Sequence, residues 1–156
     1  MKKQFKPIGL ILIVLLSFSF SDSKGMESEV NSDSGDLLIN LNNIRNNEGV
    51  IYIFLYSYEN QYPHEPYTYY RVSKSNVKNG KLKVKVENVA FKSKYAITLI
   101  DDENNNEDLD MFLGMPTEGF GFSNNIKPFF SLPDYNELIF SFDQEKMIGI
   151  QVQYFL

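Results

Sequence analysis

Short runs in which apolar and polar residues alternate recur along much of this 156-residue chain. The clearest run is Lys81–Glu87, in which Leu82, Val84 and Val86 are separated by charged residues. Successive side chains of a strand point to opposite faces, so a period of two predicts a strand with one buried face. Since no segment of the domain shows a convincing helical period, we expect an all-β protein.

Seven segments have the composition of strands. The second, Val50–Tyr58, is apolar on both faces and is predicted to be a central strand covered on both sides. Asn136–Asp143 and Met147–Phe155 are predicted to form a closing hairpin. Regular short strands separated by turns favour a seven-stranded antiparallel β-sandwich, similar to immunoglobulin domains in outline, or a small barrel. The seven segments are residues 36–41, 50–58, 67–73, 81–87, 94–101, 136–143 and 147–155.

The first 21 residues have the layout of a secretory signal peptide. Three lysines stand within the first six residues, and Ile8–Phe20 is apolar and uncharged. Ser19 and Ser21 then supply the small residues of a cleavage site. The alternative is an uncleaved anchor, but the apolar run is shorter than the ~20 residues that span a bilayer. We therefore predict an exported protein, periplasmic or extracellular, with no stable membrane span after cleavage.

Residues 22–35 are polar and are predicted to be a flexible linker before a domain at residues 36–156. Loss of the three lysines of the signal peptide takes the formal charge from −5 to −8. So acidic a chain should repel nucleic acid and anionic lipid, so neither is an expected partner. The absence of cysteine excludes disulfides, thiolate metal sites and a cysteine nucleophile.

The long segment Asp101–Asn125 lies between two predicted strands and is rich in carboxylates, side-chain amides and glycine. Part of it follows the spacing of a calcium loop, and its oxygen ligands favour Ca²⁺ over Zn²⁺. Glu107 replaces the glycine expected at position 6, and Leu113 replaces the glutamate expected at position 12. The candidate ligands are Asp102, Asn104, Asn106, Asp108 through its carbonyl, Asp110, and Glu118 as the missing carboxylate. The alternative is a loop whose Asp and Asn side chains bond to its own backbone amides.

Aromatic residues suggest a second kind of site. Phe120 and Phe122 could form a platform for a sugar or peptide, with Asn124 and Asn125 as hydrogen-bonding partners. The alternative is that the two rings fill the end of the sandwich while the two asparagines form a turn. Another aromatic cluster, which could stack on a glycan or line a partner interface, comprises Tyr62, Tyr67, Tyr69 and Tyr70.

Catalytic chemistry has little support in the sequence. His64 is the only histidine, and it stands in a proline-flanked loop typical of solvated residues. No serine lies in a G-x-S-x-G turn. Carboxylates of the long segment could form a glycosidase pair, but adjacent acids in an asparagine-rich loop fit ligand binding or solvation better. We therefore predict a protein that is not an enzyme.

Residues 95–125, YAITLIDDENNNEDLDMFLGMPTEGFGFSNN, resemble an uncharacterised bacterial family, domain of unknown function 2141. Its pattern is close to YAI-x(4)-DEN-x-N-G-x-LD, followed by G-x-P-x-EG-[YF]-GFSNN, and the resemblance extends from about Leu37 to Tyr154. The family usually has histidine at the position of Asp101 and glycine at that of Glu107. The resemblance implies an exported, transthyretin-like or carboxypeptidase-regulatory-like sandwich, and it carries no settled activity.

Together these features predict an exported, non-catalytic β-sandwich that binds a ligand or partner at the cell envelope, with the long segment as its site or its structural support. The expected partner is an envelope protein or a glycan, and Ca²⁺ is the one cofactor that the sequence suggests. The alternative is a structural or assembly module of a larger envelope complex, with no small-molecule ligand.

Overall fold

The computed structural model describes residues 33–91, 93–128 and 131–155. The predicted signal peptide and most of the predicted linker lie outside these residues and stay predictions. The first strand begins at Ser34, two residues before the expected start of the domain at Asp36. None of the helices in the described ranges is long and apolar enough to cross a membrane.

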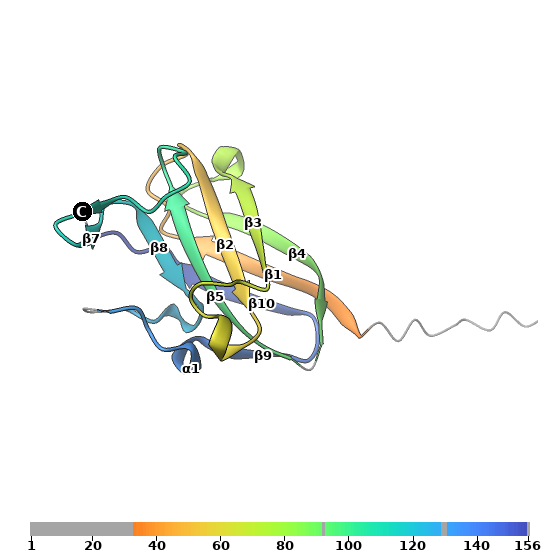
Figure 1. Cartoon of the computed structure of the whole chain (residues 1–156). Helices are drawn as coiled ribbons and strands as arrows, with labels where there is room; N and C mark the ends of the chain where they lie inside the picture. Colours follow the sequence, from red (N-terminus) through yellow and green to blue (C-terminus); the bar gives the residue numbers. More distant parts are fainter. Residues whose placement is uncertain (1–32, 92, 129–130, 156) are drawn as a thin grey trace, which may run out of the picture. The chain divides into compact units, whose positions relative to one another are not determined.

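The protein is mostly β, as the alternating sequence predicts, with ten strands among the described residues (Figure 1). Three short strands come from the long segment, which was expected to contain none. One α-helix occurs in the described ranges, α1 (Tyr135–Leu138), and it begins at a capping box of Asp134 and Glu137. The strands are β1 Ser34–Asn42, β2 Val50–Tyr56, β3 Thr68–Ser73, β4 Leu82–Ala90, β5 Ser93–Asp102, β6 Met111–Phe112, β7 Met115–Pro116, β8 Gly119–Phe122, β9 Phe140–Phe142 and β10 Lys146–Gln151. Short 3₁₀ turns, η1 Glu59–Gln61, η2 Lys74–Asn76 and η3 Ser123–Asn125, connect some of them.

The strands form two main sheets and one small hairpin. The larger sheet has the order β3-β2-β5-β8, and β9 pairs with the other end of β5. The smaller sheet has the order β10-β1-β4, and β6 and β7 form the small hairpin. β3 and β4 each stand at one edge of a sheet.

Two expectations about pairing are wrong. The sheets are not wholly antiparallel, because β10 runs parallel to β1. The predicted closing hairpin does not form either, because β9 pairs with β5 while β10 pairs with β1 in the other sheet. The physical reason is packing. The chain crosses from one sheet to the other between β9 and β10, which buries Phe142 of β9 and Ile150 of β10 completely, each from a different sheet.

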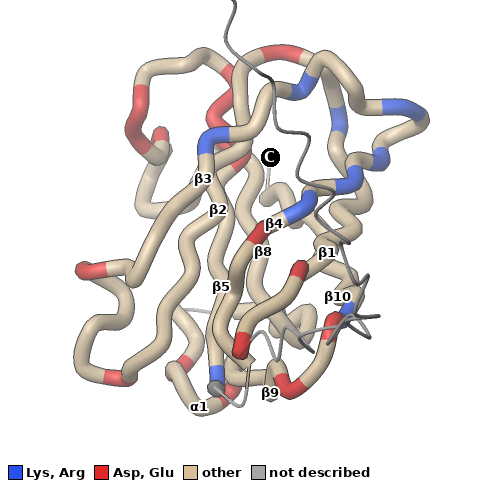
Figure 2. Tube along the Cα trace, turned by 90° about the vertical axis from the view of Figure 1, so that its right-hand side faces the viewer, with Lys and Arg blue, Asp and Glu red and all other residues tan. Residues whose placement is uncertain are grey.

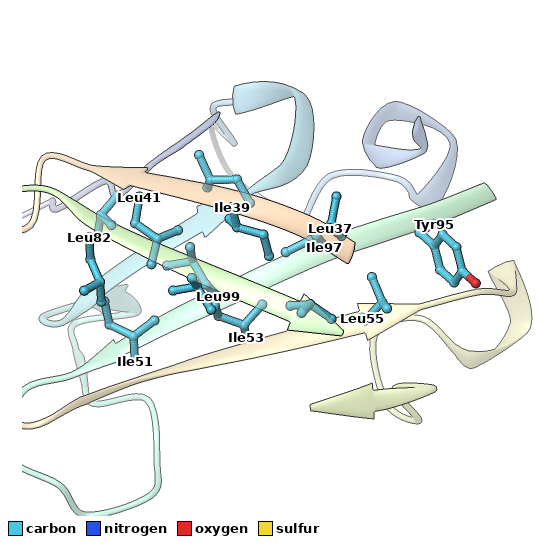
Figure 3. Packing of buried hydrophobic residues seen from close by; sticks show 14 of the residues in the cluster. Leu37, Ile39, Leu41, Ile51, Ile53, Leu55, Leu82, Tyr95, Ile97 and Leu99 are labelled. Atoms are coloured by element: carbon cyan, nitrogen blue, oxygen red, sulfur yellow. The ribbon is translucent and has the colours of Figure 1, made fainter. Parts of the chain in front are cut away.

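One hydrophobic core joins the inner faces of the two sheets. Leu37, Ile39 and Leu41 of β1 point toward Ile53 of β2 and Leu99 of β5 (Figure 3). All five side chains are at most 1% exposed. Each fully buried aliphatic side chain of this kind contributes roughly 1.5–3 kcal/mol. The alternating residues therefore supply the apolar faces that hold the two sheets together.

A second, smaller core lies on the opposite face of the larger sheet, near one end of β5. Phe120 and Phe122 of β8 pack there with Tyr56, Ala96 and Leu138. This cluster covers only part of that face. The remainder, along the middle of β2 and β3, is open to solvent and contains the aromatic residues described below.

Candidate functional site

The outer face of β2 and β3 has a cleft of about 490 Å³. β2 directs Ile51, Ile53 and Leu55 into the core, so the strand's period of two turns Tyr52 and Phe54 outward. Both are half-buried, whereas the sequence predicted a β2 strand covered on both sides. A volume of this size is within the ~300–1,000 Å³ typical of small-molecule sites.

Three aromatic rings form the floor of the cleft. The ring centroids of Tyr52 and Phe54 are 6.2 Å apart with planes 18° from parallel. Tyr69 of β3 lies 6.5 Å from Tyr52 and 6.2 Å from Phe54, and it is 61% exposed. Cross-strand register explains the grouping, because Phe54 pairs directly with Tyr69. The result is an accessible aromatic surface built on two paired strands.

The rim of the cleft is polar and partly provided by the long segment. Arg71 donates from Nε to the Tyr52 hydroxyl, at 3.2 Å, and from its terminal nitrogen to Asn105 Oδ1, at 2.5 Å. Glu107 and Asp108 also line the cleft. The arginine thus joins the sheet to the long segment, and the rim offers hydrogen-bond donors and acceptors beside an apolar floor.

The predicted calcium ligands are occupied by hydrogen bonds within the loop. Asp102 is completely buried, and its carboxylate accepts from the backbone N–H groups of Asn106 and Glu107, at 3.1 and 3.0 Å. The carboxylate of Asp110 accepts from the side-chain amides of Asn104 and Asn106. This arrangement is the self-bonded loop that the sequence left open as an alternative.

The side chains of Asp108 and Glu118 are also hydrogen-bonded, although the ligand predicted for Asp108 is its carbonyl. The side chain of Asp108 accepts from the N–H of Leu109 at 2.8 Å. Glu118 is 4% exposed, and its two oxygens accept from the N–H groups of Glu103 and Asp110, at 3.0 and 3.3 Å. Burial raises the pKa of Glu118. Within the described ranges no three His, Cys, Asp or Glu side chains are grouped so as to hold a metal ion. Calcium binding stays a prediction.

A buried ion pair lies at the start of the long segment. Lys74 Nζ is 2.6 Å from Asp101 Oδ1, and both side chains are completely buried. The Tyr154 hydroxyl donates to Asp101 Oδ2 at 2.5 Å, and Lys74 also donates to Asn46 Oδ1 at 2.8 Å. Burial raises the pKa of Asp101, although Lys74 and Tyr154 pull it down. The family that the sequence resembles usually has histidine at this position. In this chain the aspartate belongs to a network that joins β5, η2 and Tyr154.

A second, half-exposed ion pair adjoins this network. Arg45 bonds to both carboxylate oxygens of Glu103 and to the Thr117 carbonyl, while its guanidinium lies 4.5 Å from the centre of the Tyr154 ring. Burial would raise the pKa of Glu103, but the bonds and charge of Arg45 outweigh it, so the pKa is lowered. The turn between β1 and β2 is therefore tied to the beginning of the long segment.

The four residues predicted to bind a ligand have structural partners. Phe120 and Phe122 are about 95% buried in the smaller core. Asn124 donates to the carbonyls of Glu137 and Ile139, and Asn125 bonds to the backbone of Gly149 and Gln151. These four side chains join β8 to α1 and β10. A ligand role for them stays a prediction.

Ser123 also helps to join β8 to α1, and this role was not predicted. Its hydroxyl is buried, donates to the Leu138 carbonyl at 2.6 Å and accepts from the Ile97 N–H at 3.0 Å. The adjacent asparagines were the available signal, because Asn124 and Asn125 both have positive φ in the tight turn that follows.

The four tyrosines predicted as a cluster lie in four different surroundings. Tyr69 lies in the aromatic cleft, whereas Tyr62 lines a second cleft of about 550 Å³ with Tyr135 and nearby acids. Burial, with a contribution from those acids, raises the pKa of Tyr62 to about 12. Tyr67 is exposed and Tyr70 packs against the main core.

His64 is exposed in the loop after η1 and lines neither cleft.

These observations define a class: a mostly β protein with a hydrogen-bonded long loop beside an aromatic cleft. Residues 39–149 match the family model described as an uncharacterized protein conserved in bacteria, DUF2141. The chain belongs to this family, which confirms the resemblance of residues 95–125. It matches no curated protein and no solved structure.

Proposed function

We propose that the protein is an exported, non-catalytic binding protein that takes a neutral glycan in the cleft of β2 and β3. The observation that supports this most strongly is the accessible floor of three aromatic rings, Tyr52, Phe54 and Tyr69. Flat aromatic faces suit the C–H faces of sugar rings, and the polar rim suits their hydroxyl groups. The signal-peptide pattern of residues 1–21 supports export to the periplasm or the outside of the cell.

The fold fits a transthyretin-like or immunoglobulin-like sandwich, with two sheets around one core. In this proposal most of the long segment has a structural role, through its internal hydrogen bonds. Its residues Glu107 and Asp108 have a binding role, because they line one wall of the cleft. Calcium would bind only if Asp102, Asp110 and Glu118 exchanged their present hydrogen bonds for the cation. The rim acids and Arg71 would orient sugar hydroxyls rather than perform chemistry.

A binding screen with matched tyrosine variants tests the proposal. The purified protein should bind members of a panel of neutral oligosaccharides of glucose, mannose and N-acetylglucosamine. Tyr69→Ala should weaken binding about tenfold, the equivalent of about 1.4 kcal/mol. Tyr67→Ala is the control, because Tyr67 is equally exposed, at 61%, but lies outside the cleft. Equal loss in both variants, or no binding to any member of the panel, would overturn the proposal.

The second candidate is a structural module of a larger envelope complex. It is favoured by β3, whose outer edge has no partner strand among the described residues. Such an edge can accept a strand from another protein. Crosslinking in envelope membranes should then recover a stable partner through β3, and Thr68→Pro should abolish the crosslink. Recovery of the uncrosslinked protein alone would count against this candidate.

A further inference from the structure

The hairpin of β6 and β7 is an unusually apolar exposed segment. The side chains of Met111, Phe112, Leu113 and Met115 are 55%, 58%, 84% and 42% exposed. Within the part of the chain that the structure describes, β6 and β7 pair only with each other and join neither main sheet. Contiguous exposed apolar residues on a soluble domain mark interaction surfaces more often than accidents of folding.

The turn of this hairpin has an unfavourable residue at its first central position. Leu113 and Gly114 both have positive φ, 49° and 80°, as in a type I′ turn. Asparagine suits the first of these positions, and a left-handed leucine costs about 1–2 kcal/mol. The hairpin would therefore be more stable with a polar residue at its tip, so the fold does not explain the exposed leucine.

The base of the hairpin is acidic. Glu107, Asp108 and Asp110 precede β6, and no lysine or arginine occurs between Asp102 and Ile126. An apolar tip with acidic neighbours is repelled by anionic lipid and attracted to an apolar surface with a basic rim. The charge of the segment thus indicates the kind of surface that it can contact.

Such a surface is present on this same chain, on the outer face of the smaller sheet. Leu38 of β1 and Met147 of β10 are cross-strand partners and are 38% and 53% exposed. Lys83 of β4 lies beside them, across from Asn40 of β1. Basic residues gather along β4 and the turn that leads into it (Figure 2). Lys85 is part of this row, although Asp36 and Glu87 pair with it.

We propose that the β6–β7 hairpin of one copy docks on the outer face of the smaller sheet of a second copy. Leu113 and Phe112 would cover Leu38 and Met147, while the acids at the hairpin base approach Lys83. The two contact surfaces are different parts of the chain, so the association is head-to-tail and can form open chains. Four apolar side chains make a small interface, so the dissociation constant should be weak, on the order of 0.1 mM.

Sedimentation equilibrium of the purified protein tests this directly. Over roughly 0.01–1 mM, the weight-average mass should rise with concentration, because this range brackets the expected dissociation constant. Leu113→Asn should abolish the rise while leaving the melting temperature unchanged or higher, since asparagine fits the turn. Leu132→Asn is the matched control: Leu132 is 58% exposed but lies outside the hairpin, and its variant should associate as the native chain does.

Two charge variants identify the contacting surfaces. Asp108→Lys puts a positive charge at the hairpin base and Lys83→Glu puts a negative charge on the sheet face, so each variant alone brings like charges together and should associate more weakly than the native chain. Their equimolar mixture should regain association, because the reversed charge at the hairpin base of one variant then meets the opposite charge on the sheet face of the other. A constant monomer mass for the native chain overturns the proposal, as does association that Leu113→Asn leaves intact. Leu113-dependent binding to phosphatidylcholine vesicles, with no change in mass, would assign the hairpin to membranes instead.

Discussion

Replacement of Lys74 by methionine should destabilise the protein severely at neutral pH. Methionine fills most of the space of the lysine chain but removes the ammonium that lies 2.6 Å from Asp101. Both side chains are completely buried, so the aspartate loses its cation and keeps the hydrogen bond from the Tyr154 hydroxyl. Removal of one partner from a buried ion pair costs about 3–5 kcal/mol. That is a large part of the ~5–15 kcal/mol that holds a typical domain folded.

The assay is thermal and urea unfolding of the variant beside the native protein. At about 4 °C per kcal/mol for a domain of this size, the melting temperature should fall by about 12–20 °C. Lys85→Met is the control, because Lys85 pairs with Asp36 at a similar distance, 2.7 Å, but on the surface. Its variant should lose far less stability, since solvent screens exposed pairs. Addition of Asp101→Asn to Lys74→Met should restore part of the loss, because it removes the unpaired charge.

The pH dependence gives an independent check. Burial already raises the pKa of Asp101 above its usual value, and Lys74 opposes that rise, so removal of Lys74 raises the pKa further. A raised carboxyl pKa means that the folded state binds the proton more readily than the unfolded state. The penalty of Lys74→Met is therefore complete above the raised pKa and decreases as the pH falls through it. Similar losses in Lys74→Met and Lys85→Met, with no dependence on pH, would refute this reasoning.

Three further predictions concern the long segment and the turn before β2 that contacts it. Glu107 has φ of 67°, so Glu107→Gly should relieve backbone strain and raise the free energy of unfolding by about 1 kcal/mol in urea titrations, whereas a loss of stability would show that the Glu107 side chain is needed. Gly49→Ala should be strongly destabilising, because its Cβ would lie 1.9 Å from the Asp102 carbonyl oxygen; a native melting curve would contradict this. Calcium or chelator should leave the melting temperature unchanged, because Asp102 and Glu118 already accept backbone N–H groups. A calcium-dependent rise that Asp110→Ala abolishes would instead support the cation loop.

The alternation of residues predicts which way each strand faces but not which strand it joins. Leu37, Ile39 and Leu41 are in the core, as their period requires. The choice of pairing partner depends on packing between segments that are distant in sequence, and a local pattern of residues does not indicate that choice. That is why β9 and β10, which follow each other in the chain, were expected as a hairpin and belong to different sheets.

The candidate site was predictable only in part. Tyr69 was identified as one of several tyrosines, but Tyr52 and Phe54 were hidden in a strand that is apolar on both faces. The spacing of Asp and Asn residues suits a calcium loop and a self-bonded loop equally, because the same short side chains reach backbone N–H groups two residues on. Lys74 stands in a polar turn, and nothing near it in sequence indicates a buried partner at Asp101.

Binding of a neutral glycan in the cleft on β2 and β3 can be tested residue by residue. The most direct measurement is an NMR titration of the purified protein with neutral hexasaccharides of glucose, mannose and N-acetylglucosamine. The aromatic ring signals of Tyr52, Phe54 and Tyr69 should shift with one saturation curve, while those of Tyr58 and Tyr67, exposed outside the cleft, should not. Unchanged signals from the three cleft rings at saturating sugar, or shifts confined to other tyrosines, would contradict it.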